Sequence, residues 1–93
     1  MKIAAPEPPK WVTDLPDMEG WEAVDVSDGG INRWMVTRII YGWIFNIDKS
    51  GMLYANSASN NPITGQQKII KVFASPLASL IATDTLIESG FFS

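Results

Sequence analysis

Short hydrophobic runs separated by turn residues dominate the chain from residue 21 onward, a pattern typical of β-strands. Residues 21–26 alternate loosely between apolar and polar side chains and are followed by Ser27-Asp28-Gly29-Gly30, which favours a tight turn. Residues 31–47 form an apolar stretch too long for one common strand. Gly42 is the only glycine in it, so we predict strands over residues 32–40 and 43–48 with a turn at Tyr41-Gly42. A glycine bulge in one bent strand is the alternative.

The following part of the chain predicts two further strands. Asp48-Lys49-Ser50-Gly51 has the residue types of a turn and leads into an apolar strand over residues 52–56. Small polar residues over 56–67 predict an exposed loop. Residues 68–73 fit a strand slightly better than a helical stripe, because Val, Ile and Phe favour strands.

A C-terminal helix has the clearest boundaries in the sequence. Ser75 is a good N-cap, Pro76 suits the first helical position, and Gly90 is a natural stop. Apolar side chains at helical spacing predict the face that packs on the sheet, and they are Leu77, Leu80, Ile81 and Ile87.

The first twenty residues differ from the rest of the chain in their proline content. Pro6, Pro8, Pro9 and Pro16 keep the backbone extended and interrupt helices and interior strands. Residues 6–9 match the P-x-x-P pattern of polyproline ligands, for which a solvated arm is the competing interpretation.

The chain therefore divides into an extended, Pro-rich, acidic arm (residues 1–20) and a single α+β domain (residues 21–93). The domain is predicted to be a small twisted antiparallel β-meander of four or five strands, with the C-terminal helix packed on one face. Trp11, Val12 and Leu15 are able to attach the far end of the arm to this domain.

Composition excludes several classes of protein. The 93 residues are 46% hydrophobic and 11% aromatic with a net charge of −3, which does not fit a disordered chain. No apolar run approaches the length of a membrane span, and the N-terminus lacks the hydrophobic region of a signal peptide, so we expect a cytoplasmic protein. With no His and no Cys, the usual general base, nucleophile and zinc ligands are missing. We therefore expect no enzyme activity, no metal and no cofactor.

Charge is distributed unevenly along the chain. Residues 1–28 have a net charge of −5, residues 29–71 have +4, and Asp84 and Glu88 add −2. The acidic segment either lies over the basic middle or forms a surface that attracts a basic partner. The acidic residues do not make a calcium loop, because the loop that would start at Asp25 needs a carboxylate where Val36 stands. Glycine patterns for phosphate or dinucleotide binding are also absent.

Residues 33–45 carry the most candidate chemistry. Arginine and aromatic residues are interleaved there on predicted strands, an arrangement found both in protein–protein hot spots and in platforms for single-stranded nucleic acid. The candidate partner-binding residues are Arg33, Trp34, Arg38, Tyr41, Trp43 and, from the next strand, Tyr54. The competing interpretation is that most of these side chains form the core.

The number of large apolar residues on the predicted strands favours a binding role. Residues 34–36 and 39–41 place bulky side chains on both faces of the sheet, and one helix covers only one face. The second face is then closed by the arm, through Trp11 and Leu15, or by a partner or a second copy of the chain.

We therefore expect a non-catalytic module that binds another protein by occluding its surface, as an inhibitor, adaptor or accessory subunit of the kind that phages and other mobile elements often encode. A β-face centred on Trp34, Arg38, Tyr41 and Trp43 supplies the anchors, and the acidic arm steers association with a basic surface. One alternative is a nucleic-acid-binding β-domain using the same aromatics, which the net charge of −3 disfavours. Another is a structural subunit of a homodimer, a larger homo-oligomer or a virion.

Overall fold

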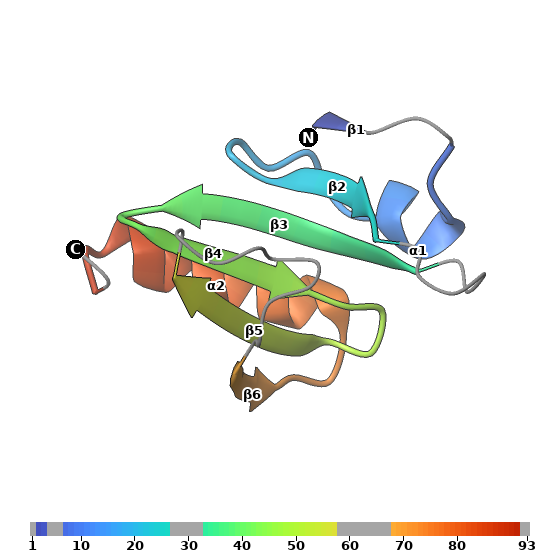
Figure 1. Cartoon of the computed structure of the whole chain (residues 1–93). Coiled ribbons are helices and arrows are strands. Elements are labelled where there is room, and N and C mark those ends of the chain that lie inside the picture. The colour runs from blue at the N-terminus through green and yellow to red at the C-terminus, as the bar shows by residue number, and fades with distance from the viewer. Residues whose placement is uncertain (1, 4–6, 27–32, 58–67, 92–93) are drawn as a thin grey trace.

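The fold is an antiparallel meander with helices on one side. The computed structural model describes residues 2–3, 7–26, 33–57 and 68–91. Within these ranges the chain forms one six-stranded sheet in sequence order, from β1 to β6 (Figure 1). β1 is parallel to β2, and each later strand is antiparallel to the one before it, so the predicted α+β meander is confirmed. The elements are β1 (Lys2–Ile3), α1 (Lys10–Thr13), β2 (Glu22–Asp25), β3 (Trp34–Ile40), β4 (Trp43–Ile47), β5 (Met52–Ser57), β6 (Lys68–Val72) and α2 (Pro76–Glu88).

β3 and β4 form the hairpin that the sequence predicts. Val36 pairs with Ile47 at one end of the ladder and Ile40 pairs with Trp43 at the other. The two turn residues, Tyr41 and Gly42, have positive φ angles of 53° and 77°. This combination defines a two-residue hairpin turn whose twist matches that of the strands, so the alternative of one bent strand with a bulge is wrong.

The next turn and strand also agree with the sequence. Asp48 accepts hydrogen bonds from the backbone nitrogens of Ser50 and Met52 at 2.9 and 3.1 Å, which closes the turn between β4 and β5. β6 pairs with β5, so the prediction of a strand after residue 67 is confirmed. Most of the predicted loop over 56–67 and the predicted turn over 27–30 lie outside the described residues, although residues 56 and 57 belong to β5.

α2 begins and ends where the sequence predicts. The Ser75 hydroxyl accepts a hydrogen bond from the Ala78 backbone nitrogen at 3.1 Å, and Gly90, with a φ of 80°, follows the last turn. The predicted apolar face is only half right, because Leu77 and Ile81 are exposed. The side chains that α2 buries are Ser79, Leu80, Thr83 and Ile87.

The orientation of α2 has a polar cause. The Asp84 carboxylate accepts hydrogen bonds from the Trp21 indole at 3.0 Å and from Arg38, both on the sheet side of the helix. Asp84 shares a helix face with Leu80 and Ile87 because of the helical repeat. Binding of Asp84 therefore turns this face toward the sheet and leaves Leu77 and Ile81 outside.

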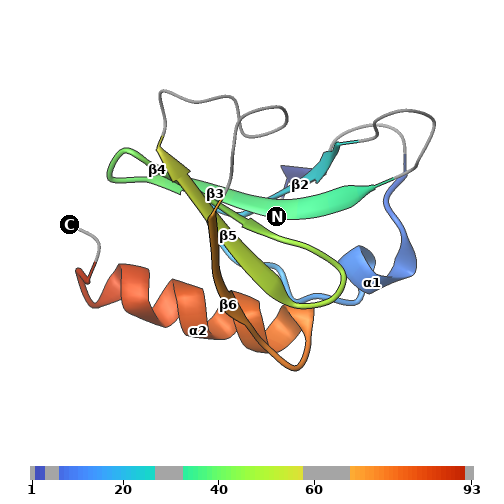
Figure 2. The same ribbon diagram turned by 60° about the horizontal axis from the view of Figure 1, so that its bottom comes forward.

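The N-terminal arm carries two elements that its proline pattern does not predict, β1 and α1. α1 starts after Pro9, whose φ of −69° and ψ of 165° are extended, and it ends before Pro16. Val12 is buried, and Trp11 and Leu15 pack against core residues. Both helices lie on the same side of the sheet (Figure 2), so this part of the arm does not close the second face.

The core lies between the sheet and the helices. Its main cluster is formed by Trp21, Val36, Phe45, Ile47, Leu53, Ala55, Leu80 and Ile87. A smaller cluster beside α1 contains Val12, Ala23 and Trp34. In the described part of the chain, neither helix combines the length and the apolar composition that crossing a membrane requires.

Candidate functional site

Three of the six predicted contact residues share one face of the sheet, and most of that face is covered. Trp34, Arg38 and Trp43 occupy the same side as the core residues Val36 and Phe45, as the strand register requires. Both helices lie on this side (Figure 2). The predicted β-face is therefore not open at Trp34 and Arg38, whereas Trp43, at the end of the ladder, remains partly exposed. Trp34 is only 8% exposed, because it packs in the cluster beside α1.

Arg38 joins the sheet to α2. One guanidinium nitrogen donates to the Asp84 carboxylate, and the other donates to Glu88 Oε1 at 3.2 Å. The Arg38 side chain is 12% exposed. Gly20 lies so close that a Cβ there would be 3.1 Å from Arg38 Nε. Arg38 is therefore enclosed by its own chain and is engaged with two carboxylates.

Exposed apolar side chains gather where β3 turns into β4. Ile39, Tyr41 and Trp43 are 64%, 55% and 42% exposed, and we call these three residues the hairpin tip. The C-terminal end of α2 lies at the same end of the molecule (Figures 1 and 2). Glu88 on α2 and Glu22, which lines a small hollow together with Ile39, place carboxylates beside the hairpin tip.

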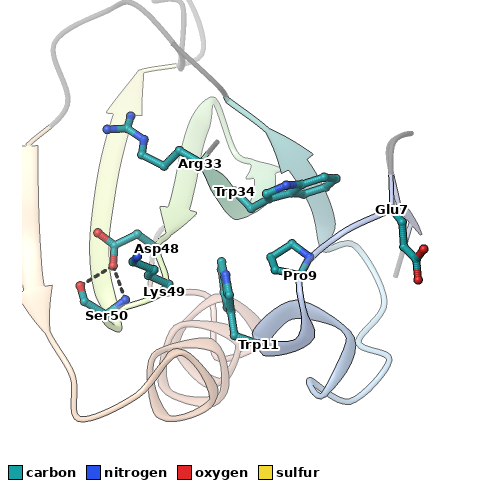
Figure 3. A pocket seen from close by; sticks show the side chains of 8 residues that line it. All are labelled: Glu7, Pro9, Trp11, Arg33, Trp34, Asp48, Lys49 and Ser50. Carbon is teal, nitrogen blue, oxygen red and sulfur yellow. Dashed lines mark hydrogen bonds between the residues drawn. The ribbon is translucent and has the colours of Figure 1, made fainter. Parts of the chain in front are cut away.

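A cavity of about 520 Å³ lies at the opposite end of β3 and β4. Its lining comes from the segment before α1, from α1 itself, from the start of β3 and from the β4–β5 turn (Figure 3). We call it the tryptophan pocket, and the residues that line it are Glu7, Pro9, Trp11, Arg33, Trp34, Asp48, Lys49 and Ser50. Trp11, Pro9 and Trp34 form the middle of the lining, Arg33, Asp48 and Lys49 lie on one side, and Glu7 lies on the other.

The Asp48 carboxylate accepts hydrogen bonds from residues of the β4–β5 turn and of β5. Oδ1 accepts hydrogen bonds from the backbone nitrogens of Ser50 and Met52 and from the Ser50 hydroxyl, and Oδ2 accepts one from the Tyr54 hydroxyl at 3.1 Å. Partial burial raises the pKa of Asp48, but these hydrogen bonds outweigh burial and hold the pKa below its ordinary value. Burial and the bond to Asp48 raise the pKa of Tyr54, which the nearby charge of Arg33 partly opposes.

Five of the six predicted residues are thus divided between the two ends of the sheet. Tyr41 and Trp43 belong to the hairpin tip, Arg33 and Trp34 line the tryptophan pocket, and Tyr54 reaches that pocket only through Asp48. Arg38 lies in the ion-pair network with α2.

The tryptophan pocket has no signal in the sequence. Trp11 is predicted to attach the arm to the domain, and Asp48 and Lys49 are predicted to form a turn, but nothing in the sequence connects the two segments. Their proximity depends on α1 packing beside β3, which has no local signal.

Comparison of the chain with protein-family models, curated proteins and solved structures gives no match. Among the described residues, no three His, Cys, Asp or Glu side chains come together in a group able to hold a metal ion. Function is therefore inferred from the exposed side chains and the pocket of this fold.

Proposed function

We propose that the protein is a non-catalytic module that binds another protein through the hairpin tip. The observation that carries this proposal is the conformation of Tyr41. In the described part of the chain it is the only non-glycine residue with a positive φ, and it is exposed. An aromatic residue in this conformation lowers the stability of the fold, so its presence at an exposed turn favours a functional role for the ring.

The neighbours of Tyr41 suit a protein interface. Tyr and Trp are enriched among residues that dominate protein–protein binding energy, because each buries a large area with few rotatable bonds. Trp43 follows Tyr41 by two residues and is partly exposed, and Ile39 adds an aliphatic side chain on the other face of the hairpin. The hairpin tip therefore offers two aromatic anchors and an apolar flank to a partner.

The charges around the hairpin tip favour a partner with a basic surface. Glu22 and Glu88 lie beside it. Opposite charges around an apolar centre speed association and select the partner, while the apolar contacts provide most of the affinity. Binding of this kind would occlude a basic surface that surrounds an apolar slot.

The nucleic-acid alternative has less support from the geometry. Arg38 is engaged with Asp84 and Glu88, and Trp34 is nearly buried. Arg38 is therefore not available to meet phosphates, and Trp34 is not displayed on an open strand face, as a single-strand platform requires.

A capture experiment with matched variants tests the proposal. The tagged chain is used to retain proteins from an extract of its native host, in parallel with Tyr41→Ala, Trp43→Ala and the control Ile69→Ala. Ile69 is 57% exposed on β6, away from the hairpin tip. A partner that depends on the hairpin tip should be retained by the original chain and by the control, and its purified form should bind each tip variant at least about tenfold more weakly.

Folding and salt dependence complete this test. Circular dichroism should show that both tip variants remain folded, because their side chains are exposed. If Trp43→Ala and Tyr41→Ala unfold the domain, these rings belong to the core and the proposal is wrong. A captured nucleic acid whose binding weakens steeply with salt would also contradict it, since a protein interface with aromatic anchors responds more gently.

A further inference from the structure

The tryptophan pocket has the size and lining of a small-molecule site. Its volume of about 520 Å³ lies within the range of cavities that bind ligands of a few hundred daltons. Trp11, Pro9 and Trp34 give it an apolar lining suited to a flat ring (Figure 3). It lies at the opposite end of β3 from the hairpin tip, so it shares no lining residue with the proposed protein interface.

The charged groups of the pocket leave two cations open to a ligand. Among the described residues, Arg33 and Lys49 form no ion pair, and both are exposed beside the cavity. The carboxylate drawn on the same side of the pocket in Figure 3, Asp48, is already engaged in four hydrogen bonds within its turn. Glu7 lies on the far side of the aromatic lining from Lys49.

We propose that the tryptophan pocket binds an aromatic carboxylate. The ring lies against Trp11, Pro9 and Trp34, and the carboxylate is directed to Arg33 and Lys49. An arginine and a lysine together provide charge-assisted hydrogen bonds that a neutral ligand does not receive. The same chemistry occurs in two sources, a free aromatic acid and a peptide that ends in an aromatic residue with a free C-terminus.

The four indole groups of the chain allow ligand binding to be measured by NMR. In the ¹⁵N-labelled full chain, each Trp side chain gives its own N–H signal in a two-dimensional NMR spectrum. Titration with 3-phenylpropionate should shift the signals of Trp11 and Trp34 in a saturable way. The signals of Trp21, which is buried and bonded to Asp84, and of Trp43, at the hairpin tip, should remain in place.

A neutral ligand and charge-removing variants test the role of the two cations. The isosteric 3-phenylpropionamide should bind about tenfold more weakly, and so should the acid on the Arg33→Gln/Lys49→Gln double variant. Lys71→Gln is the matched control, because Lys71 is an exposed lysine on β6 outside the pocket, and it should not change binding. The peptide Gly-Gly-Phe with a free C-terminus, compared with its amide, shows which of the two sources fits better.

Three results would overturn this inference. They are the absence of a shift at Trp11 and Trp34 up to about 10 mM ligand, equal binding of the acid and the amide, and parallel shifts of all four indoles. Tyr41→Ala should leave ligand binding unchanged. Failure of the pocket to bind the acid therefore says nothing against the hairpin tip, and the reverse also holds.

Discussion

Tyr41 combines an unfavourable backbone conformation with an exposed side chain. Its φ of 53° lies in the left-handed region, where Asn and Gly fit better than an aromatic residue. A non-glycine residue held there costs on the order of 1–3 kcal/mol. Because more than half of Tyr41 is exposed, burial within its own chain offsets little of this cost. Tyr41 therefore lowers the stability of its own turn, and this cost is the basis of the proposed interface at the hairpin tip.

Replacement of Tyr41 should separate stability from binding. We expect Tyr41→Asn to raise the free energy of unfolding by about 1 kcal/mol, because Asn adopts the left-handed conformation more readily. Urea denaturation measures this difference. Tyr41→Ala is the control, since Ala keeps the same conformational cost, and its stability should stay within about 0.5 kcal/mol of the original. Equal stability of the Asn and Ala variants would show that the turn is not strained.

Asp48 stabilises the β4–β5 turn in its ionised form. Because hydrogen bonds hold its pKa below the ordinary 3.8 in the folded chain, its contribution to stability is present above that value and is lost as the pH falls through the folded pKa. We therefore expect Asp48→Asn to lower the free energy of unfolding at neutral pH and to have a smaller effect at about pH 3. Urea denaturation at both pH values tests this. The exposed Asp14→Asn serves as control, and a pH-independent difference for Asp48→Asn would contradict the assignment.

At the level of elements, the β4–β5 turn depends on Gly51 in two ways. Its φ is +89°, and a Cβ there would lie 2.7 Å from the Phe73 carbonyl oxygen and 2.8 Å from the Ser75 carbonyl carbon. Gly42 has a similar φ of +77°, but its Cβ position has no neighbour within 4 Å. The two glycines therefore distinguish the cost of a backbone conformation from the cost of a clash.

Alanine at these two positions should have unequal effects. Gly42→Ala should cost about 1 kcal/mol for the positive φ alone, and Gly51→Ala should cost about 2 kcal/mol more, because rigid backbone atoms must also move. Thermal and urea denaturation of the two variants measure the difference. If both cost the same, the segment between β6 and α2 shifts without penalty and the close approach at Gly51 has no role in stability.

Elements were predictable where the decisive interactions are local. The turn at Tyr41-Gly42 and the helix start at Ser75 depend on a few adjacent residues, so the sequence predicts both positions. The face that α2 buries depends instead on Asp84, whose partners Trp21 and Arg38 are 63 and 46 residues away. No helical periodicity reveals such a pairing, and for this reason the apolar spacing places Leu77 and Ile81 on the buried face although the structure exposes them.

At the scale of the whole molecule, the candidate sites are also predictable from the sequence only where adjacent residues determine them. Residue types make Tyr41 and Trp43 candidate binding residues, and both side chains are exposed. The tryptophan pocket is assembled from three separate segments, so Arg33 and Trp34 could be selected from the sequence while their neighbours in the pocket could not. Apolar residues on strands also do not reveal which face a helix covers, and Trp34 was therefore expected to be open.

Asp84 connects the arm, the sheet and α2. Its carboxylate accepts hydrogen bonds from the Trp21 indole and the Arg38 guanidinium. Removal of this carboxylate leaves a largely enclosed arginine without its closest partner. We expect Asp84→Ala to lower the free energy of unfolding by about 2 kcal/mol, less than a fully buried pair would cost because both side chains retain some exposure. Glu88→Ala is the matched control. Its carboxylate binds the same arginine but is 67% exposed, so a change below about 1 kcal/mol is expected.

The effect of Asp84→Ala is also measurable at the end of the arm. Trp21 follows directly on the arm, and its bond to Asp84 holds that end of the arm against α2. Asp84→Ala should therefore shift the Trp21 indole signal in the NMR spectrum and speed proteolysis at the exposed residues 16, 17, 19 and 20, whereas Glu88→Ala should do neither. If the two variants lose the same stability and leave Trp21 unchanged, packing of Leu15 and Met18 against the core holds the arm, and the ion-pair network does not.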